Sequence, residues 1–429
     1  MRTWRNRRAG LVGALLATAL VVAGCGSPAA GPAPAPGAPS AAAGVVRGPF
    51  GGPSSSDTTP GTGSTFTPVT ASTTAAPIPV PTSDGRVHLA YELVLTNTIG
   101  QPATIGGVEV VGDGRSLLRL EGDGLAPWIK PFGSDLGTRV LQPGQGALVW
   151  LDVSLAPTDP VPAQLLHRLD VQFAQPNPPL VPAALTEPVA PTTVDRTPPV
   201  SISPPLAGAG WLDGNSCCTV TAHRAAVSPI DGRLFAPERF AIDYVRLDAQ
   251  DRQMTGPPTD IASYPFDGAD ILAVADGPIV GLVGDLPQQP PGADPTGLRL
   301  DEYSGDHVVQ DLGNGRYALY AHLQSGNPLN LAVGQQLRRG QVLGKLGNSG
   351  NTDGPHLHFH VMDGPDPLAS NGLPFVFDSY TVDGRVVSQE SLQEGAQGPV
   401  PFRVDRAGAG PRGGTMPLVL DVMSYPPGP

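Results

Sequence analysis

The sequence lacks a block of basic residues outside its first ten positions. It holds 26 lysines and arginines against 38 aspartates and glutamates, a formal net charge of -12. Because nucleic-acid binding relies on basic patches that meet phosphates, this balance gives little support to a nucleic-acid partner. Residues that favour helices are thinly spread, whereas the chain of 429 residues contains 55 glycines and 51 prolines. This composition favours strands and turns over helices.

Cysteine is scarce, and Cys25 stands apart from the other two. It follows the basic segment MRTWRNRRAG and the apolar run LVGALLATALVVAG, which is too short to span a membrane. With Ala23 and Gly24 directly before it, Cys25 resembles the lipobox cysteine of bacterial lipoproteins. The resemblance implies cleavage of a signal peptide at 1–24, lipidation of Cys25, and an anchor on the outer face of the cytoplasmic membrane. A soluble secreted protein cleaved nearby is the alternative.

The remaining cysteines, Cys217 and Cys218, are adjacent in the chain. Outside the cytoplasm thiols tend to oxidise, and each of these two has only the other as an intramolecular partner once Cys25 is lipidated. We therefore favour a vicinal disulfide. Two free buried thiols, or soft metal ligands together with His223, are the alternatives.

Composition and periodicity divide the exported chain into five segments. Alternating apolar residues in RVHLAYELVLTNTIG, ALVWLDVSL and HRLDVQF predict strands with one buried face, typical of a β-sandwich. His88 and His167 are lone histidines in these strands and are expected to be structural. The predicted segments are a disordered tether at 25–83, an accessory β-sandwich at 84–176, a Pro-rich linker at 177–200, a second β-domain at 201–383 and a Gly/Pro-rich extension at 384–429.

Three histidines alternate in the stretch GPHLHFHV: His356, His358 and His360. Successive side chains of a strand point to opposite faces, so all three imidazoles are expected on one face. Imidazoles gathered in this way suit metal binding and proton transfer.

Several segments of the second β-domain resemble the M23 (lysostaphin/LytM-type) zinc metallopeptidases. The matching segments are ERFAIDYVRLD, YAHL, VGQQLRRGQVLG and GNSGNTDGPHLHF, in that order along the chain within 235–365. The resemblance implies a barrel-like β-sheet fold and hydrolysis of peptide bonds in bacterial peptidoglycan. By position it implies Asp243 and His358 as zinc ligands, with His322 and His356 as the non-ligand catalytic histidines. Zinc lowers the pKa of a bound water and polarises the scissile carbonyl.

One family position is changed. Four residues before Asp243, where the family has a histidine ligand, stands Arg239. A guanidinium has no lone pair for a metal, and on one strand face with Asp243 it could pair with that carboxylate. His223 or His360 could supply the third ligand instead. Alternatively, the domain binds no metal and acts as a degenerate module that binds peptidoglycan or regulates a partner cell-wall hydrolase. His307 and His360 could also be plain groove histidines.

Overall fold

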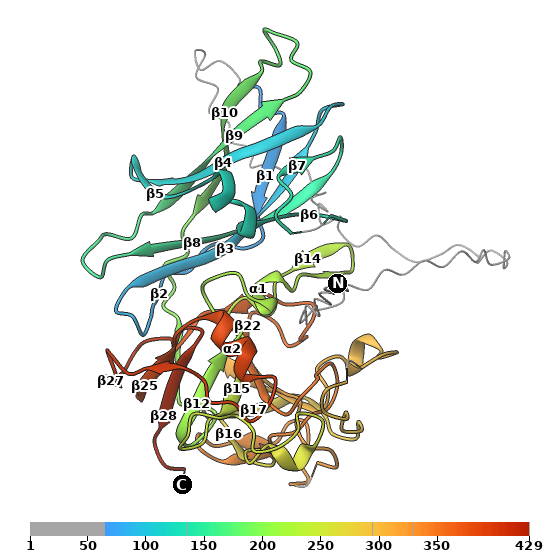
Figure 1. Ribbon diagram of the computed structural model, residues 1–429, viewed down its shortest axis with the longest axis vertical. Coiled ribbons are helices and arrows are strands. Elements are labelled where there is room, and N and C mark those ends of the chain that lie inside the picture. Colours follow the sequence, from blue (N-terminus) through green and yellow to red (C-terminus); the bar gives the residue numbers. More distant parts are fainter. Residues whose placement is uncertain (1–64, 135, 294, 328, 429) are drawn as a thin grey trace, which may run out of the picture. The chain divides into compact units, whose positions relative to one another are not determined.

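The computed structural model describes residues 65–428 except 135, 294 and 328. The predicted signal peptide, the lipidation site at Cys25 and the tether up to residue 64 lie outside the described residues. From Thr67 onward the chain forms one compact unit, and it is built mainly from strands (Figure 1). The prediction of a mainly β protein is confirmed. Among the described residues, no helix is long and apolar enough to cross a membrane.

The N-terminal strands form two antiparallel sheets that pack against each other. The first sheet has the order β1-β3-β8-β6, with β2 beside β3. It comprises β1 (Val69–Thr73), β2 (Val80–Pro81), β3 (Val87–Asn97), β6 (Ile129–Pro131) and β8 (Gly146–Leu155). The second sheet has the order β10-β9-β4-β5, with β7 beside β4. It comprises β4 (Ala103–Gly112), β5 (Arg115–Glu121), β7 (Val140–Leu141), β9 (Gln164–Phe173) and β10 (Ala184–Thr193).

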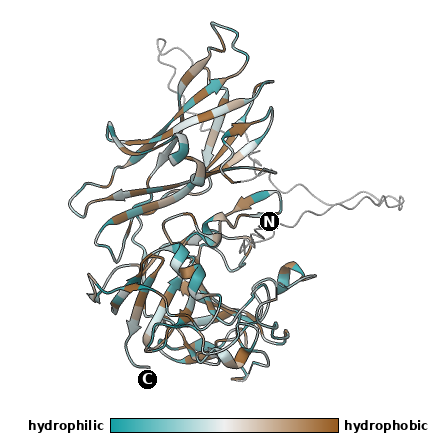
Figure 2. Cartoon of the chain, in the orientation of Figure 1, coloured by the Kyte–Doolittle hydropathy of each residue, from teal (hydrophilic) through white to brown (hydrophobic). Residues whose placement is uncertain are grey.

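The sandwich extends beyond 84–176 at both ends. Strand β1 pairs with β3, and β10 pairs with β9, so residues assigned to the tether and to the linker belong to the two sheets. Both strands lie at sheet edges, where the chain tolerates prolines such as Pro188 and polar threonines that hide a strand pattern. Inside the sandwich, alternating residues such as Leu89, Leu93, Val149 and Leu169 are fully buried, and the same alternation of apolar and polar residues is visible along the strands (Figure 2).

The second β-domain is built on a 12-stranded sheet. Its path is β20-β17-β18-β19-β22-β15-β12-β28-β25-β26, with β23 beside β22 and β27 beside β25. The strands are β12 (Gly208–Gly214), β15 (Ile242–Arg246), β17 (Gly277–Val283), β18 (His307–Gly313), β19 (Arg316–Ala321), β20 (Gln336–Leu337), β22 (Leu357–Met362), β23 (Gly372–Leu373), β25 (Tyr380–Val386), β26 (Val404–Asp405), β27 (Gly410–Arg412) and β28 (Asp421–Tyr425).

Short elements complete this domain. Three small ladders join β11 (Val200–Ile202) to β24 (Phe375–Phe377), β13 (Ser228–Ile230) to β14 (Arg233–Phe235), and β16 (Asp270–Leu272) to β21 (Val342–Lys345). The α-helices are α1 (Ala222–Ala225) and α2 (Gln389–Gly395). Cys217 and Cys218, just before α1, form the predicted vicinal disulfide.

The C-terminal segment is part of this sheet. Strand β28 pairs with β12 on one side and with β25 on the other, and Met423 within it is fully buried. The Gly/Pro-rich segment predicted at 384–429 therefore contributes a strand to the interior of this sheet. A single five-residue strand among glycines and prolines carries too little periodicity to reveal that it lies inside a sheet.

Candidate metal centre

The site is built on neighbouring strands of the large sheet. Asp243 of β15 lies directly across from His358 of β22, and His358 is also paired with Ala321 at the end of β19. This register places the Asp243 carboxylate beside the His358 imidazole, with Oδ1 and Nδ1 3.0 Å apart. The two residues assigned as ligands by resemblance therefore lie together.

His223 reaches the same carboxylate from the short helix α1. Its Nε2 lies 3.0 Å from Asp243 Oδ2. Thr221 caps the helix by accepting a hydrogen bond from the Arg224 N–H. The His223 Nδ1–H donates to the Ala241 carbonyl at 3.0 Å, so Nε2 is the ring nitrogen that faces Asp243. A histidine whose other ring nitrogen is fixed in this way is typical of metal sites.

The donor set of His223, Asp243 and His358 fits a zinc ion. One ligand atom from each residue lies within 4.8 Å of the other two. Zinc ligands at about 2.0–2.2 Å in a tetrahedron stand about 3.3 Å apart, close to the 3.0 Å separations on either side of Asp243. Two imidazoles and one carboxylate are also a ligand set used by catalytic zinc, which keeps a further position for water.

His360 occupies a different place. Its Nδ1 lies 2.9 Å from His358 Nε2, behind the ring that faces Asp243. If His358 offers its Nδ1 lone pair to a metal, its Nε2–H donates to His360, which therefore orients the ligand. His360 is buried, and its Nε2 has no hydrogen-bond partner among the described residues.

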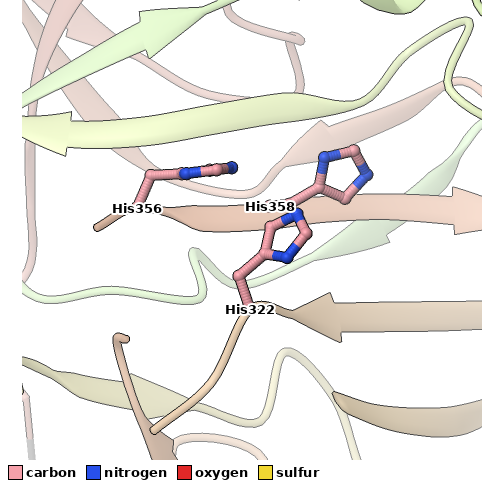
Figure 3. A group of neighbouring side chains, drawn as sticks. All are labelled: His322, His356 and His358. Carbon is pink, nitrogen blue, oxygen red and sulfur yellow. The ribbon is translucent and has the colours of Figure 1, made fainter. Parts of the chain in front are cut away.

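His322 and His356 face each other beside this set. Their ring centroids are 4.7 Å apart, and Figure 3 shows both with His358, from the ends of adjacent strands. His322 follows β19 with a φ of 62°, a left-handed conformation that is uncommon for a residue other than glycine and recurs at functional sites. The Nδ1 of His322 bonds the Ser349 carbonyl at 2.7 Å, and that of His356 bonds the Gly354 carbonyl at 2.9 Å. These backbone bonds leave the Nε2 of each ring for other contacts, and the Nε2 of His356 lies 3.2 Å from Asp243 Oδ1.

Burial and neighbouring charges shift the pKa values of the site residues in opposite directions. Burial alone would lower the pKa of His223, but the Asp243 carboxylate raises it to about 9. Burial would raise the pKa of Asp243, yet His223 and His356 hold it well below its usual range. Burial, together with His356 and His358, holds the pKa of His322 well below its usual value. The Asp243 carboxylate is therefore ionised.

Arg239 does not pair with Asp243. It lies in the turn before β15, outside the strand, and its guanidinium binds Glu92 of the sandwich, with Nη2 2.6 Å from Oε2. The expectation that it could occupy the Asp243 carboxylate is wrong, because the turn directs its side chain to a different acid. The Asp243 carboxylate instead contacts the imidazoles of His223, His356 and His358.

Some residues at the site carried no signal in the sequence. Asn215, directly after β12, donates a hydrogen bond from its side-chain amide to Asp243 Oδ2 at 2.9 Å. Its place follows from the pairing of Gly214 with Asp243, which only the sheet register reveals.

Three histidines lie away from the site: His88 binds Asp152, His167 binds the Tyr91 hydroxyl, and His307 binds the Gly305 carbonyl.

Comparisons with known proteins agree with the resemblance over part of the chain. Residues 259–370 match the family model described as Peptidase family M23. A 64-residue segment is 38% identical to the peptidoglycan DD-endopeptidase ShyA of Vibrio cholerae, and it spans 15% of this chain and 14% of that protein. The segment that resembles this relative is therefore a small part of its length.

Solved structures of M23 proteins also align, at low similarity. A mutant catalytic domain of the prophage-encoded M23 protein EnpA from Enterococcus faecalis is 17% identical with a TM-score of 0.22, covering 40% of this chain and 92% of that one. The lysostaphin catalytic domain from Staphylococcus simulans is 18% identical with a TM-score of 0.20, covering 38% and 86%. A zinc containing peptidase from Vibrio cholerae is 14% identical with a TM-score of 0.20, covering 66% and 80%. The sequence matches, and not these alignments, support an M23 peptidase segment.

Proposed function

We propose that this protein is a zinc metalloendopeptidase that hydrolyses peptide bonds of peptidoglycan. The observation that carries the proposal is the meeting of His223 and His358 on the two oxygens of Asp243. The match to the M23 family model supports the reaction class. The name of the relative, a peptidoglycan DD-endopeptidase, supports the substrate class.

In this proposal His223, Asp243 and His358 hold the zinc ion. The ion supplies an activated water and polarises the carbonyl of the scissile peptide bond. Asn215 and the Ala241 carbonyl fix the orientation of the Asp243 carboxylate and the His223 ring. His360 accepts the His358 Nε2–H and so keeps the Nδ1 lone pair of that ligand available to the metal.

His322 and His356 are the proposed proton-handling pair. Both rings are tied through Nδ1 to backbone carbonyls, so both present Nε2 to the same space. One imidazole accepts the proton of the attacking water, and the other, protonated, donates a hydrogen bond to the oxyanion that forms on the substrate. Burial, together with His356 and His358, holds the pKa of His322 well below its usual value, so its ring is neutral.

We also propose, from the sequence, that Cys25 carries a lipid anchor and that the protein acts in the cell envelope outside the cytoplasmic membrane. The full chain and a Cys25→Ser variant, expressed in a bacterial host, are compared by membrane fractionation and intact mass. The wild type is expected in the membrane fraction with the mass of an acylated Cys25. A wild type that is soluble and unmodified would contradict the anchor.

The test of the activity uses the purified full chain and isolated peptidoglycan. Zinc-loaded protein is expected to release soluble peptides with new amino termini, detected by mass spectrometry. Treatment with a chelator is expected to stop release, and added zinc to restore it. Zinc-loaded protein that sediments with peptidoglycan but releases nothing would overturn the proposal. That outcome would favour a module that binds the wall or regulates a partner hydrolase.

A further inference from the structure

Three buried charged side chains meet in a cluster that involves the two segments carrying His223 and Asp243. Glu92 of β3 in the sandwich is fully buried, and the guanidinium groups of Arg224 and Arg239 both approach its carboxylate. Arg224 follows the proposed ligand His223 by one residue, and Arg239 precedes Asp243 by four. One acid of the sandwich is thus shared by the two segments that bring His223 and Asp243 together.

The Arg239 contact is multiply hydrogen bonded. Its Nε lies 3.0 and 2.9 Å from the two oxygens of Glu92, and its Nη2 lies 2.6 Å from Oε2. The remaining guanidinium hydrogens reach the Gly372 carbonyl at 3.1 Å and the Thr74 hydroxyl at 3.0 Å. The Thr74 hydroxyl donates in turn to Glu92 Oε2 at 2.7 Å. These hydrogen bonds fix the turn that leads directly into β15.

Arg224 holds the helix that carries His223. Its Nε lies 3.6 Å from Glu92 Oε1. Its guanidinium also donates to the Cys218 carbonyl at 3.1 Å and, from Nη2, to the carbonyls of Tyr91 and Leu151 in the sandwich at 3.4 and 3.2 Å. A four-residue helix cannot hold its position through its own hydrogen bonds. These contacts hold it instead.

Burying such groups is costly unless each charge is compensated. Two buried guanidinium groups beside each other would repel if Glu92 lost its charge, and both segments would move to separate them. The structure keeps Glu92 ionised: burial would raise its pKa, but Arg239 and Arg224 hold it below its usual value.

We propose that Glu92 is a positioning residue for the zinc site: through Arg224 and Arg239, this sandwich carboxylate sets the distance between His223 and Asp243. This inference rests on the proposed zinc function. It gives the arginine at position 239 a role, and it makes the accessory sandwich part of the support of the metal centre. Direct hydrogen-bond partners of metal ligands commonly change affinity 10–100-fold when they are replaced, and Glu92 acts one step further out, through the two arginines.

The test compares zinc affinity of the full chain with that of a Glu92→Gln variant, by competition with a chromophoric chelator well below the unfolding temperature. Zinc affinity is expected to fall at least about tenfold. The matched control is Glu187→Gln, which replaces another fully buried sandwich carboxyl, one that accepts a hydrogen bond from the Val69 N–H. The control is expected to bind zinc within about twofold of the wild type.

Two further variants keep the test decisive if Glu92→Gln does not fold. Arg224→Met leaves the Glu92 carboxylate paired with the Arg239 guanidinium, so no buried charge is left uncompensated. This variant is expected to weaken zinc binding about as much as Glu92→Gln. Glu92→Asp keeps the charge and is expected to bind zinc more tightly than Glu92→Gln. Wild-type affinity in folded Glu92→Gln or Arg224→Met would overturn the inference, whatever their stability. A wild type that binds no zinc would instead overturn the proposed function.

Discussion

The Nε2 atom of His223 lies 3.0 Å from Oδ2 of Asp243, although twenty positions separate the two residues in the sequence. The resemblance to M23 peptidases placed a ligand four residues before Asp243, where Arg239 stands. The structure brings a histidine to the same carboxylate from a separate short helix. The expected properties of the site follow from this contact.

Replacing either histidine of the proposed proton-handling pair is expected to remove activity and spare the metal. His322→Ala and His356→Ala should each lower the rate of peptide release by about 10²–10⁴-fold, the usual contribution of a general acid or base. Both variants should still bind one zinc per chain, because His223, Asp243 and His358 are intact. Rates on peptidoglycan and metal content of the same samples check this. Loss of zinc from both variants would contradict the division of roles.

Restoring the family's histidine at position 239 is expected to harm the protein. In Arg239→His the buried Glu92 loses its closest partner, at a cost of about 3 kcal/mol in the free energy of unfolding. Zinc affinity should not rise, because the side chain at 239 is directed to Glu92. Urea unfolding and zinc titration measure the two effects. Recovery of zinc binding in His223→Ala/Arg239→His, relative to His223→Ala alone, would show that the site can use position 239 after all.

The sandwich carries a pH-sensitive carboxyl at Glu187. Burial, partly opposed by the Val69 N–H, raises its pKa to about 7, so the folded state binds this proton more tightly than the unfolded state. Its contribution to stability is therefore fully present below about pH 4.5 and is lost as the pH rises through 7.

Glu187→Gln should accordingly gain stability over the wild type as the pH rises from 5 to 8. We expect the gain to be on the order of 2 kcal/mol, measured as the difference in free energy of unfolding between the two proteins at each pH. Comparing variant with wild type cancels the other titrating groups. A difference that is the same at pH 5 and pH 8 would contradict the assignment.

The C-terminal strand is expected to be essential for folding of the second domain. Met423 of β28 is fully buried, so Met423→Ala should lower the free energy of unfolding by about 2–5 kcal/mol. Val400→Ala is the matched control, because Val400 is 50% exposed, and it should change stability by about 0.5 kcal/mol or less. Equal effects of the two substitutions on thermal or urea unfolding would contradict the position of β28 inside the sheet, between β12 and β25.

Strand periodicity and the alternating histidines predicted much of this molecule. They indicated a β-sandwich, a second β-domain and a cluster around His358, because a two-residue period fixes which side chains share a face. They could not reveal the partner of Arg239, because Glu92 lies 147 positions away in the sequence. Nor could they choose between His223 and His360. That choice depends on where the four-residue helix that carries His223 lies in three dimensions, which the sequence around it does not reveal.

Metal analysis of His223→Ala beside His360→Ala tests the central claim most directly. Both full-length variants and the wild type are purified after zinc loading, and zinc per chain is measured by mass spectrometry. We predict about one zinc in the wild type, little or none in His223→Ala, and retained zinc of lower affinity in His360→Ala, because His360 contacts only the far side of a ligand. Full zinc in His223→Ala would contradict the three-ligand site and the mechanism built on it.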